Sequence, residues 1–227
     1  MCGRFTITVT MDELKDYLKD YYDIDEMKSD LVVPRYNVAP GQDVISVIND
    51  GNINRVGLFK WGFVPSFAKD EKIGYSMINA KSETLHEKPS YRPSFEHKRC
   101  VILANGFYEW KKENKEKIPM RILMKDQSIF PIAGLWSTFI RIDGTKLHTC
   151  TIVTTEANDL VSQIHDRMPV ILTEEARKSW LDPKITDYRL LTPILKPFEP
   201  DLMFSYPVSP KVNKSTYDES DCIESLL

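Results

Sequence analysis

The middle of the chain is dominated by apolar stretches of strand length, and these stretches constrain the fold most. A pair of similar stretches, 44–48 and 53–59, flanks the turn sequence Asn49-Asp50-Gly51-Asn52, which predicts a β-hairpin. We therefore expect an α+β fold, a single domain with a curled, mostly antiparallel, barrel-like β-sheet flanked by short helices. The strands predicted for the middle are 99–104, 106–111, 118–124, 129–139 and 146–154.

Helices are expected to be few and short. Thr10 and Glu13 have the spacing of a capping box, so a helix should begin after Thr10. Two short helices are predicted at 156–164 and 174–181, the second capped by Thr173. The apolar face of the first helix would consist of Leu14, Tyr17, Leu18 and Tyr21.

The remaining segments are expected to be irregular. Residues 35–41 read as a loop, and the prolines between 193 and 210 point to an extended surface segment. Lys111–Lys117 is a plausible hairpin turn. We divide the chain into one domain, 1–210, and a C-terminal tail, 211–227.

Charge and composition limit the classes of function. The chain has 227 residues, 42% of them hydrophobic, and a net charge of −3, so bulk positive charge does not hold it to nucleic acid. No signal peptide or transmembrane stretch is visible, which predicts a cytoplasmic, reducing location. No metal site is expected, because the cysteines lack C-x-x-C spacing. They are Cys2, Cys100, Cys150 and Cys222.

Cys2 is the residue with the most distinctive chemistry. Removal of Met1 would leave an α-amine and a thiol on adjacent carbons, and this pair condenses with an aldehyde to a thiazolidine ring. An amine pKa of about 7.7–8.0 leaves a usable neutral fraction at physiological pH. The competing interpretation is a small residue buried near the terminus, which position alone favours, because free cysteines usually behave as buried hydrophobes.

Two further groups contain candidate catalytic residues. Asn79 and Lys81 could hold a polar oxygen and a phosphate, although a turn followed by a capped helix explains the same residues. Glu109 lies between two aromatic residues, and burial there would favour proton transfer near neutral pH. An outward-facing glutamate paired with a lysine across a hairpin is the alternative for Glu109.

His165 stands in the most unusual local sequence, His165-Asp166-Arg167 followed by Pro169, with apolar residues on both sides. An imidazole titrating near pH 6.5 could act as an acid–base group shaped by its neighbours. The alternative is a solvated helix end.

Six motifs together resemble the SRAP proteins, the SOS-response-associated peptidase family, whose members process abasic sites. The resemblance runs from Met1 to about Pro210, and the motifs occur in the order seen in that family. They are MCGRF at 1–5, RYNVAP at 35–40, WGFVPS at 61–66, INAK at 78–81, GFYEW at 106–110 and HDRMP at 165–169.

The resemblance implies a specific chemistry. SRAP proteins lose the initiator methionine, apparently by their own activity, and crosslink through a thiazolidine to abasic sites in single-stranded DNA. Cys2 would be the nucleophile, and Asn79 would orient the reacting amine and sugar. Glu109 would assist methionine removal and proton transfer, and His165 would exchange protons with the opened sugar. No cofactor is implied, and we expect a monomer.

The implied DNA-binding residues are Arg4, Lys81, Phe67, Asn37 and Pro40, with Arg4 gripping the phosphates next to the lesion. Two of them depart from the family. Lys81 replaces an arginine that is frequent there, so it offers a point charge without a bidentate fork. Phe67 is the nearest aromatic residue where the family often has a tryptophan wedge, which suggests weaker stacking.

Two other functions fit parts of the sequence. Class II glutamine amidotransferases also begin Met-Cys-Gly, so an N-terminal-nucleophile amidohydrolase is the first alternative. A non-covalent module that binds single strands or modified bases is the second.

Overall fold

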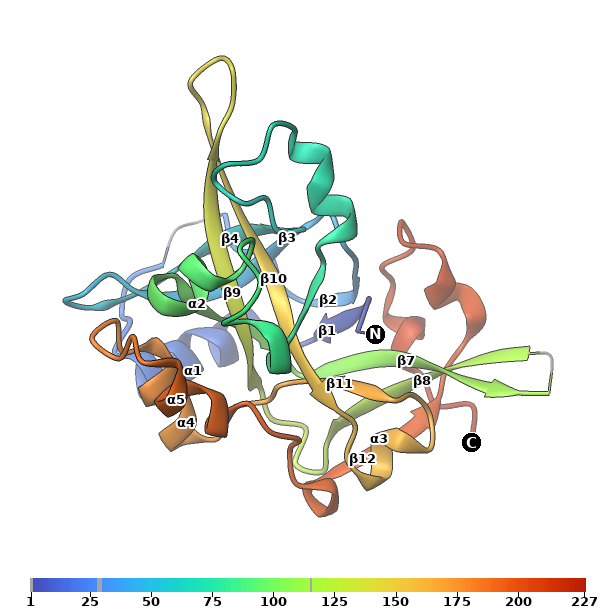
Figure 1. The fold of residues 1–227 in the computed structure, drawn as a ribbon. Coiled ribbons are helices and arrows are strands. Elements are labelled where there is room, and N and C mark those ends of the chain that lie inside the picture. Colours follow the sequence, from blue (N-terminus) through green and yellow to red (C-terminus); the bar gives the residue numbers. More distant parts are fainter. Residues whose placement is uncertain (1, 28–29, 115) are drawn as a thin grey trace.

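The computed structural model describes residues 2–27, 30–114 and 116–227, and its centre is a closed five-stranded β-barrel (Figure 1). Antiparallel pairs join β3 to β4, β3 to β6, β6 to β9 and β9 to β10, and a parallel pair between β10 and β4 closes the ring. The barrel strands are β3 (Asp43–Asn49), β4 (Asn54–Trp61), β6 (Arg99–Ala104), β9 (Phe130–Ile140) and β10 (Lys146–Glu156).

A second sheet packs against the barrel and carries the N-terminal strand. Its order is β12-β8-β7-β1-β2, with antiparallel neighbours throughout. Only Asn105 separates β6 from β7, so the chain passes directly from the barrel into this sheet. One apolar core lies between the two, because Phe5 and Phe107 belong to the same buried cluster as Ile102 and Ile152. The strands are β1 (Phe5–Ile7), β2 (Arg35–Val38), β7 (Gly106–Glu113), β8 (Glu116–Met124) and β12 (Met203–Pro207).

Two short strands flank β10 where it leaves the barrel. β5 (Asn79–Lys81) pairs with β10 in parallel, and β11 (Arg167–Pro169) pairs with it antiparallel. Both pairings include Thr154, which lies opposite Lys81 on one side and Pro169 on the other. Residues distant in sequence are therefore held on adjacent strands.

The helices lie outside the barrel, and α1, α4 and α5 gather at one end of it (Figure 1). The capping box is confirmed, since Thr10 and Glu13 exchange hydrogen bonds at the start of α1. The buried face of α1 consists of Leu14, Leu18 and Tyr22. The expectation that Tyr21 belongs to this face is wrong. The i, i+4, i+8 spacing continues to Tyr22 and leaves Tyr21 half-exposed. The α-helices are α1 (Met11–Tyr22), α2 (Arg92–His97), α3 (Asp159–Ser162), α4 (Glu174–Leu181) and α5 (Tyr188–Leu191). The 3₁₀ helices are η1 (Glu71–Ser76), η2 (Ser82–Thr84), η3 (Thr192–Ile194), η4 (Pro200–Leu202), η5 (Pro210–Asn213) and η6 (Ser220–Ile223).

The predicted fold class is confirmed, and so are the hairpin around Asp50 and the helix capped by Thr173. Three local expectations are corrected. The predicted loop 35–41 contains β2, which pairs with β1, and the predicted helix at 156–164 is reduced to α3 because β10 continues to Glu156. The segment 193–210 includes β12, which pairs with β8. Among the described residues, no helix combines the length and apolarity needed to cross a lipid bilayer.

Residues 210–223 pack against β2 and β7. Asp218 accepts hydrogen bonds from the backbone amides of Tyr36 and Asn37 at 2.6 and 2.7 Å, and it forms an ion pair with Arg35. The Tyr108 hydroxyl, on β7, donates to the carbonyl of Tyr36 at 2.7 Å. This segment, termed here the C-terminal brace, therefore holds strands β2 and β7 of the second sheet. The domain division at residue 210 stays a prediction.

Candidate active site around the N-terminal cysteine

Cys2 lies at the entrance to β1 and is fully buried. β1 pairs with β7 through Phe5 and Phe107, and the amide of Tyr108 donates to the carbonyl of Arg4 at 2.9 Å. Continued along the chain, this antiparallel register places the residues that precede Arg4 beside Glu109 on β7. The Asn79 side chain then fixes the backbone, because its Nδ2 donates to the Cys2 carbonyl at 2.9 Å.

The Cys2 thiol is held in its neutral form. Burial raises its pKa well above the usual range, and the nearby Glu109 carboxylate raises it further. The Sγ atom donates a weak hydrogen bond to the Arg4 carbonyl at 3.8 Å. A buried neutral thiol becomes a nucleophile only when a base takes its proton, so the chemistry of Cys2 requires a neighbouring acceptor.

Glu109 is the carboxyl group next to this thiol. It is 2% exposed and lies opposite Met120 in the β7–β8 pairing, which excludes the outward-facing alternative. Burial raises the pKa of Glu109 to about 7, and the charge of Asp166 acts in the same direction. At physiological pH the group therefore exists in both forms, and it can both accept and donate a proton.

Asn79 is positioned by the strand that carries it. The Trp61 indole Nε1 donates to the carbonyl of Ile78 at 2.8 Å, and the Tyr91 hydroxyl donates to the carbonyl of Asn79 at 3.3 Å. Within the described ranges the buried Oδ1 of Asn79 accepts no hydrogen bond. Such an acceptor costs about 1–3 kcal/mol until a donor satisfies it, so it favours a ligand that carries an N–H or O–H group.

His165 precedes β11 and is half-buried. Its Nδ1 lies 3.0 Å from the amide of Arg167 and 2.8 Å from Oδ1 of Asp166. The neutral ring accepts from the amide and carries its proton on Nε2, whereas the protonated ring donates from Nδ1 to Asp166. Burial lowers the pKa of His165, so the neutral form prevails near pH 7.

Arg167 joins the strand that follows His165 to the segment that follows Asn79. Its Nη1 and Nη2 atoms form a bidentate pair with Glu83 at 2.6 and 3.0 Å, and Nη2 also donates to the Thr154 carbonyl at 2.7 Å. The Arg167 side chain is 11% exposed. Glu83 was not among the predicted site residues, and its position two residues after Lys81 was the signal in the sequence that could have identified it.

Arg4 and Asn37, two of the predicted DNA-binding residues, are engaged with the C-terminal brace. Arg4 Nη1 donates to Asn37 Oδ1 at 2.9 Å and to the Val212 carbonyl, and Nη2 donates to the Asn213 carbonyl at 3.2 Å. Asn37 is fully buried. Its Nδ2 lies within hydrogen-bond distance of the carbonyls of Val212, Lys214 and Tyr217.

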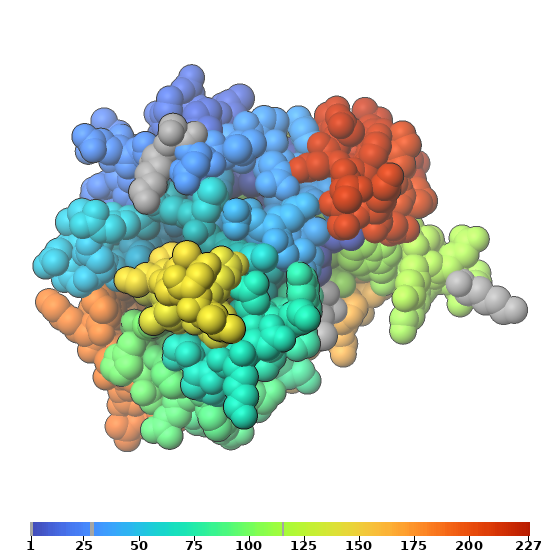
Figure 2. All heavy atoms as spheres, turned by 90° about the horizontal axis from the view of Figure 1, so that it is seen from above, coloured from blue at the N-terminus to red at the C-terminus, as the bar shows by residue number. Residues whose placement is uncertain are grey.

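The other three predicted DNA-binding residues lie nearer the surface. Lys81 is exposed at the end of β5, Pro40 is half-exposed in the turn before β3, and Phe67 is 64% exposed. Phe67 belongs to the segment 63–78, which lies beside the tip of the β9–β10 hairpin when seen from above (Figure 2). The backbones of Gly62 and Gly74 cross so closely that a Cβ on Gly62 would lie 2.9 Å from the Gly74 carbonyl oxygen.

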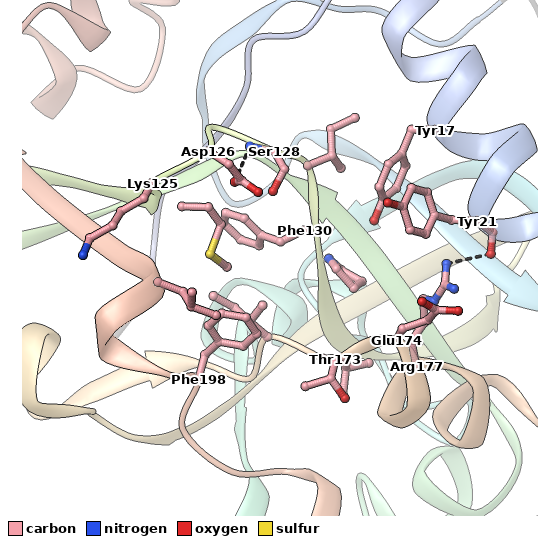
Figure 3. Close-up of a pocket in the computed structure, with 16 residues that line it drawn as sticks. Tyr17, Tyr21, Lys125, Asp126, Ser128, Phe130, Thr173, Glu174, Arg177 and Phe198 are labelled. Carbon is pink, nitrogen blue, oxygen red and sulfur yellow. Dashed lines mark hydrogen bonds between the residues drawn. The ribbon is translucent and has the colours of Figure 1, made fainter.

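A pocket of about 430 Å³ lies elsewhere on the molecule, between α1, the β8–β9 turn and the start of α4 (Figure 3). Tyr17, Tyr21, Phe130, Phe198 and Arg177 line it. None of the predicted site residues contributes to its wall. The candidate site is therefore the surface around the N-terminal strand and not this pocket.

Comparisons with known proteins find relatives that are named abasic site processing proteins. A Bacillus subtilis (strain 168) protein named abasic site processing protein YoqW is 48% identical over 227 residues, covering 99% of this chain and 100% of that protein. The abasic site processing protein HMCES of Xenopus tropicalis is 28% identical over 270 residues, covering 100% of this chain and 79% of that protein.

A solved structure and a family model also match this chain. A crystal structure of a Bacteroides thetaiotaomicron protein matches with a TM-score of 0.87 at 28% identity, covering 99% of this chain and 100% of that chain. The family model for SOS response associated peptidase (SRAP) matches residues 1–215. With the fold, the order of its motifs and this match in agreement, the chain belongs to the SRAP family.

Proposed function

We propose that this protein processes abasic sites in single-stranded DNA by capturing the sugar aldehyde covalently on Cys2. The relatives named as abasic site processing proteins support the substrate. The observation that carries the chemistry is the placement of Cys2, whose carbonyl is held by Asn79 and whose thiol adjoins a carboxyl group with a pKa of about 7. The free amine requires removal of Met1, which lies outside the described residues.

The reaction proceeds in two bond-forming stages. The α-amine of Cys2 adds to the aldehyde carbon of the opened sugar, and loss of one water leaves an imine. The thiol sulfur then adds to the imine carbon, the C=N π pair moves to nitrogen, and the thiol proton is transferred to that nitrogen. The product is a thiazolidine, with one water released overall.

Glu109 moves the thiol proton in this proposal. As a carboxylate it takes the proton from the buried thiol, and as a carboxylic acid it gives the proton to the ring nitrogen. A pKa of about 7 makes both transfers accessible near neutral pH. The same group would activate water for removal of Met1, which is the peptidase activity in this proposal.

Asn79 and His165 act on the sugar. The free Oδ1 of Asn79 would accept a hydrogen bond from the reacting amine or a sugar hydroxyl. In neutral His165, the Nδ1 contact with the Arg167 amide places the proton on Nε2, from which the ring can donate to the sugar oxygen. The Arg167–Glu83 ion pair ties the strand that follows His165 to the segment that follows Asn79, across the intervening strand β10, while these transfers occur.

DNA binding would use the surface around these residues. Lys81 would neutralise a phosphate, while Phe67 and Pro40 would contact the bases beside the lesion. Arg4 would reach a phosphate through the part of its guanidinium that the brace leaves unused. Asn37 is buried, so it would act by orienting Arg4.

The decisive experiment incubates the purified protein with a single-stranded oligonucleotide that contains one abasic site. We expect an adduct on a denaturing gel, with an intact mass one water below the sum of the DNA and the protein lacking Met1. Cys2→Ala should give no adduct. Cys2→Ser should likewise give none without a reductant, because both variants keep the amine but lack the thiol. Borohydride, which traps the imine, should reveal an adduct with either variant.

Cys222→Ala, which changes another buried cysteine, is the matched control and should crosslink normally. An adduct of full yield from Cys2→Ala would refute the proposal. Turnover of glutamine by the purified protein would instead favour the amidohydrolase alternative.

A further inference from the structure

The β7–β8 hairpin extends outward from the second sheet, as both views show (Figures 1 and 2). Strand β7 carries Glu109 at the site and then continues to Glu113. Beyond the site, Lys112 on β7 lies directly opposite Lys117 on β8. Both lysines are exposed. The hairpin whose strand β7 carries Glu109 therefore also presents a pair of positive charges.

This pairing is electrostatically unfavourable by itself. Like charges directly opposite on neighbouring strands destabilise a sheet. Lys111, the adjacent residue, lies 3.9 Å from Glu113, whereas neither Lys112 nor Lys117 has an acidic partner among the residues that the structure describes. A bound anion would offset the repulsion. A chain with a net charge of −3 needs such local positive charge to hold a nucleic acid.

The pair also lies within reach of the site. Lys112 is three residues beyond Glu109, about 10 Å along an extended strand. Burial lowers the pKa of His165, and the charge of Lys112 acts in the same direction, as expected for groups that are close in space. Because side chains alternate along a strand, Lys112 projects from the face of β7 that carries Tyr108 and Trp110, opposite to Glu109. A single strand with its reacting nucleotide at Cys2 would reach the two lysines by turning onto that face.

We propose that Lys112 and Lys117 bind the backbone phosphates of the single strand next to the reacting nucleotide, which makes the β7–β8 hairpin a DNA-binding arm. The inference rests on the proposed function and adds a binding surface to it. The hairpin contributes phosphate contacts without base recognition, so its effect is independent of DNA sequence.

The test compares Lys112→Gln/Lys117→Gln with Lys125→Gln/Lys184→Gln, which removes the same charge from exposed lysines near α1 and α4. Binding of an undamaged single-stranded oligonucleotide is measured by fluorescence anisotropy over a range of salt concentrations. Loss of two phosphate contacts should flatten the slope of log K against log salt by about 1.4, equivalent to about 25-fold weaker binding at about 0.1 M salt. The control should keep the wild-type slope.

Two further measurements separate the explanations. The melting temperature of Lys112→Gln/Lys117→Gln should equal or exceed that of the wild type, because a repulsive pair is removed; a lower value would indicate a structural role and overturn the proposal. An unchanged slope, or an equal change in both double variants, would also overturn it. If the wild type forms no adduct with abasic DNA, the proposed function fails, while the slopes still decide the role of the arm.

Discussion

Glu109→Gln should make the protein more stable at neutral pH while removing the proposed proton-transfer group. Burial raises the pKa of Glu109 from 4.5 to about 7, so the folded protein binds this proton more tightly than the unfolded chain does. Below about pH 4.5 both states are protonated, and the full contribution of the protonated group to stability is present. As the pH rises towards 7, the unfolded chain releases its proton first and the folded state loses stability.

The magnitude follows from the two pKa values. Each pH unit between 4.5 and about 7 costs the folded state about 1.4 kcal/mol, so the total loss is about 3 kcal/mol and is complete above about pH 7. Glutamine resembles the protonated acid and does not titrate. The two proteins should therefore be equally stable near pH 4.5, and the variant should be more stable by about 3 kcal/mol near pH 8.

Urea unfolding followed by tryptophan fluorescence measures this difference, since Trp61 and Trp180 are fully buried. Glu83→Gln is the control of opposite sign, because the ion pair with Arg167 lowers the pKa of Glu83. That variant should be less stable than the wild type at neutral pH, and the difference should close as the pH falls through the lowered pKa. A difference in the free energy of unfolding between Glu109→Gln and the wild type that does not change with pH would refute the reasoning.

Three other substitutions test the remaining roles. Asn79→Ala should slow adduct formation by up to about tenfold at saturating DNA, because it removes the hydrogen bond to the Cys2 carbonyl; an unchanged single-turnover rate would contradict this. His165→Ala should slow adduct formation or reversal at least about tenfold with little loss of affinity for undamaged strands, and a change in affinity alone would assign it to binding. Arg4→Ala should destabilise the fold by about 1–3 kcal/mol, because Asn37 Oδ1 loses its hydrogen-bond donor. It should also flatten the slope of log K against log salt for single-stranded DNA by about 0.7. An unchanged slope would show that Arg4 has only a structural role.

The features that the sequence predicted correctly depend on neighbours in the chain. The capping box needs only Thr10 and Glu13, and the hairpin around Asp50 needs only its turn residues and the flanking alternation. The fold class followed from the number and spacing of such local strands. The identities of the candidate catalytic residues came from the motifs of the family, which name residues without giving their geometry.

The features that were missed depend on contacts between distant residues. Asp218 binds the backbone at Tyr36 and Asn37, more than 180 positions away, and the carbonyls that the Asn37 side chain contacts lie at least 175 positions away. The pair between Arg167 and Glu83 spans 84 positions. Neither contact leaves a periodic pattern, because each depends on a single charged side chain whose distant partner is set by the path of the chain through the fold.

The C-terminal brace also sets the order in which the protein can mature during synthesis. β1 emerges from the ribosome early, but Arg4 has no access to the Val212 and Asn213 carbonyls until those residues have left the exit tunnel. The strand next to Cys2 is therefore secured only after some 210 residues have been translated. A nascent chain therefore carries Cys2 long before the strand beside it is secured, so the proposed action of the neighbouring side chains on Cys2 would wait for the completed fold.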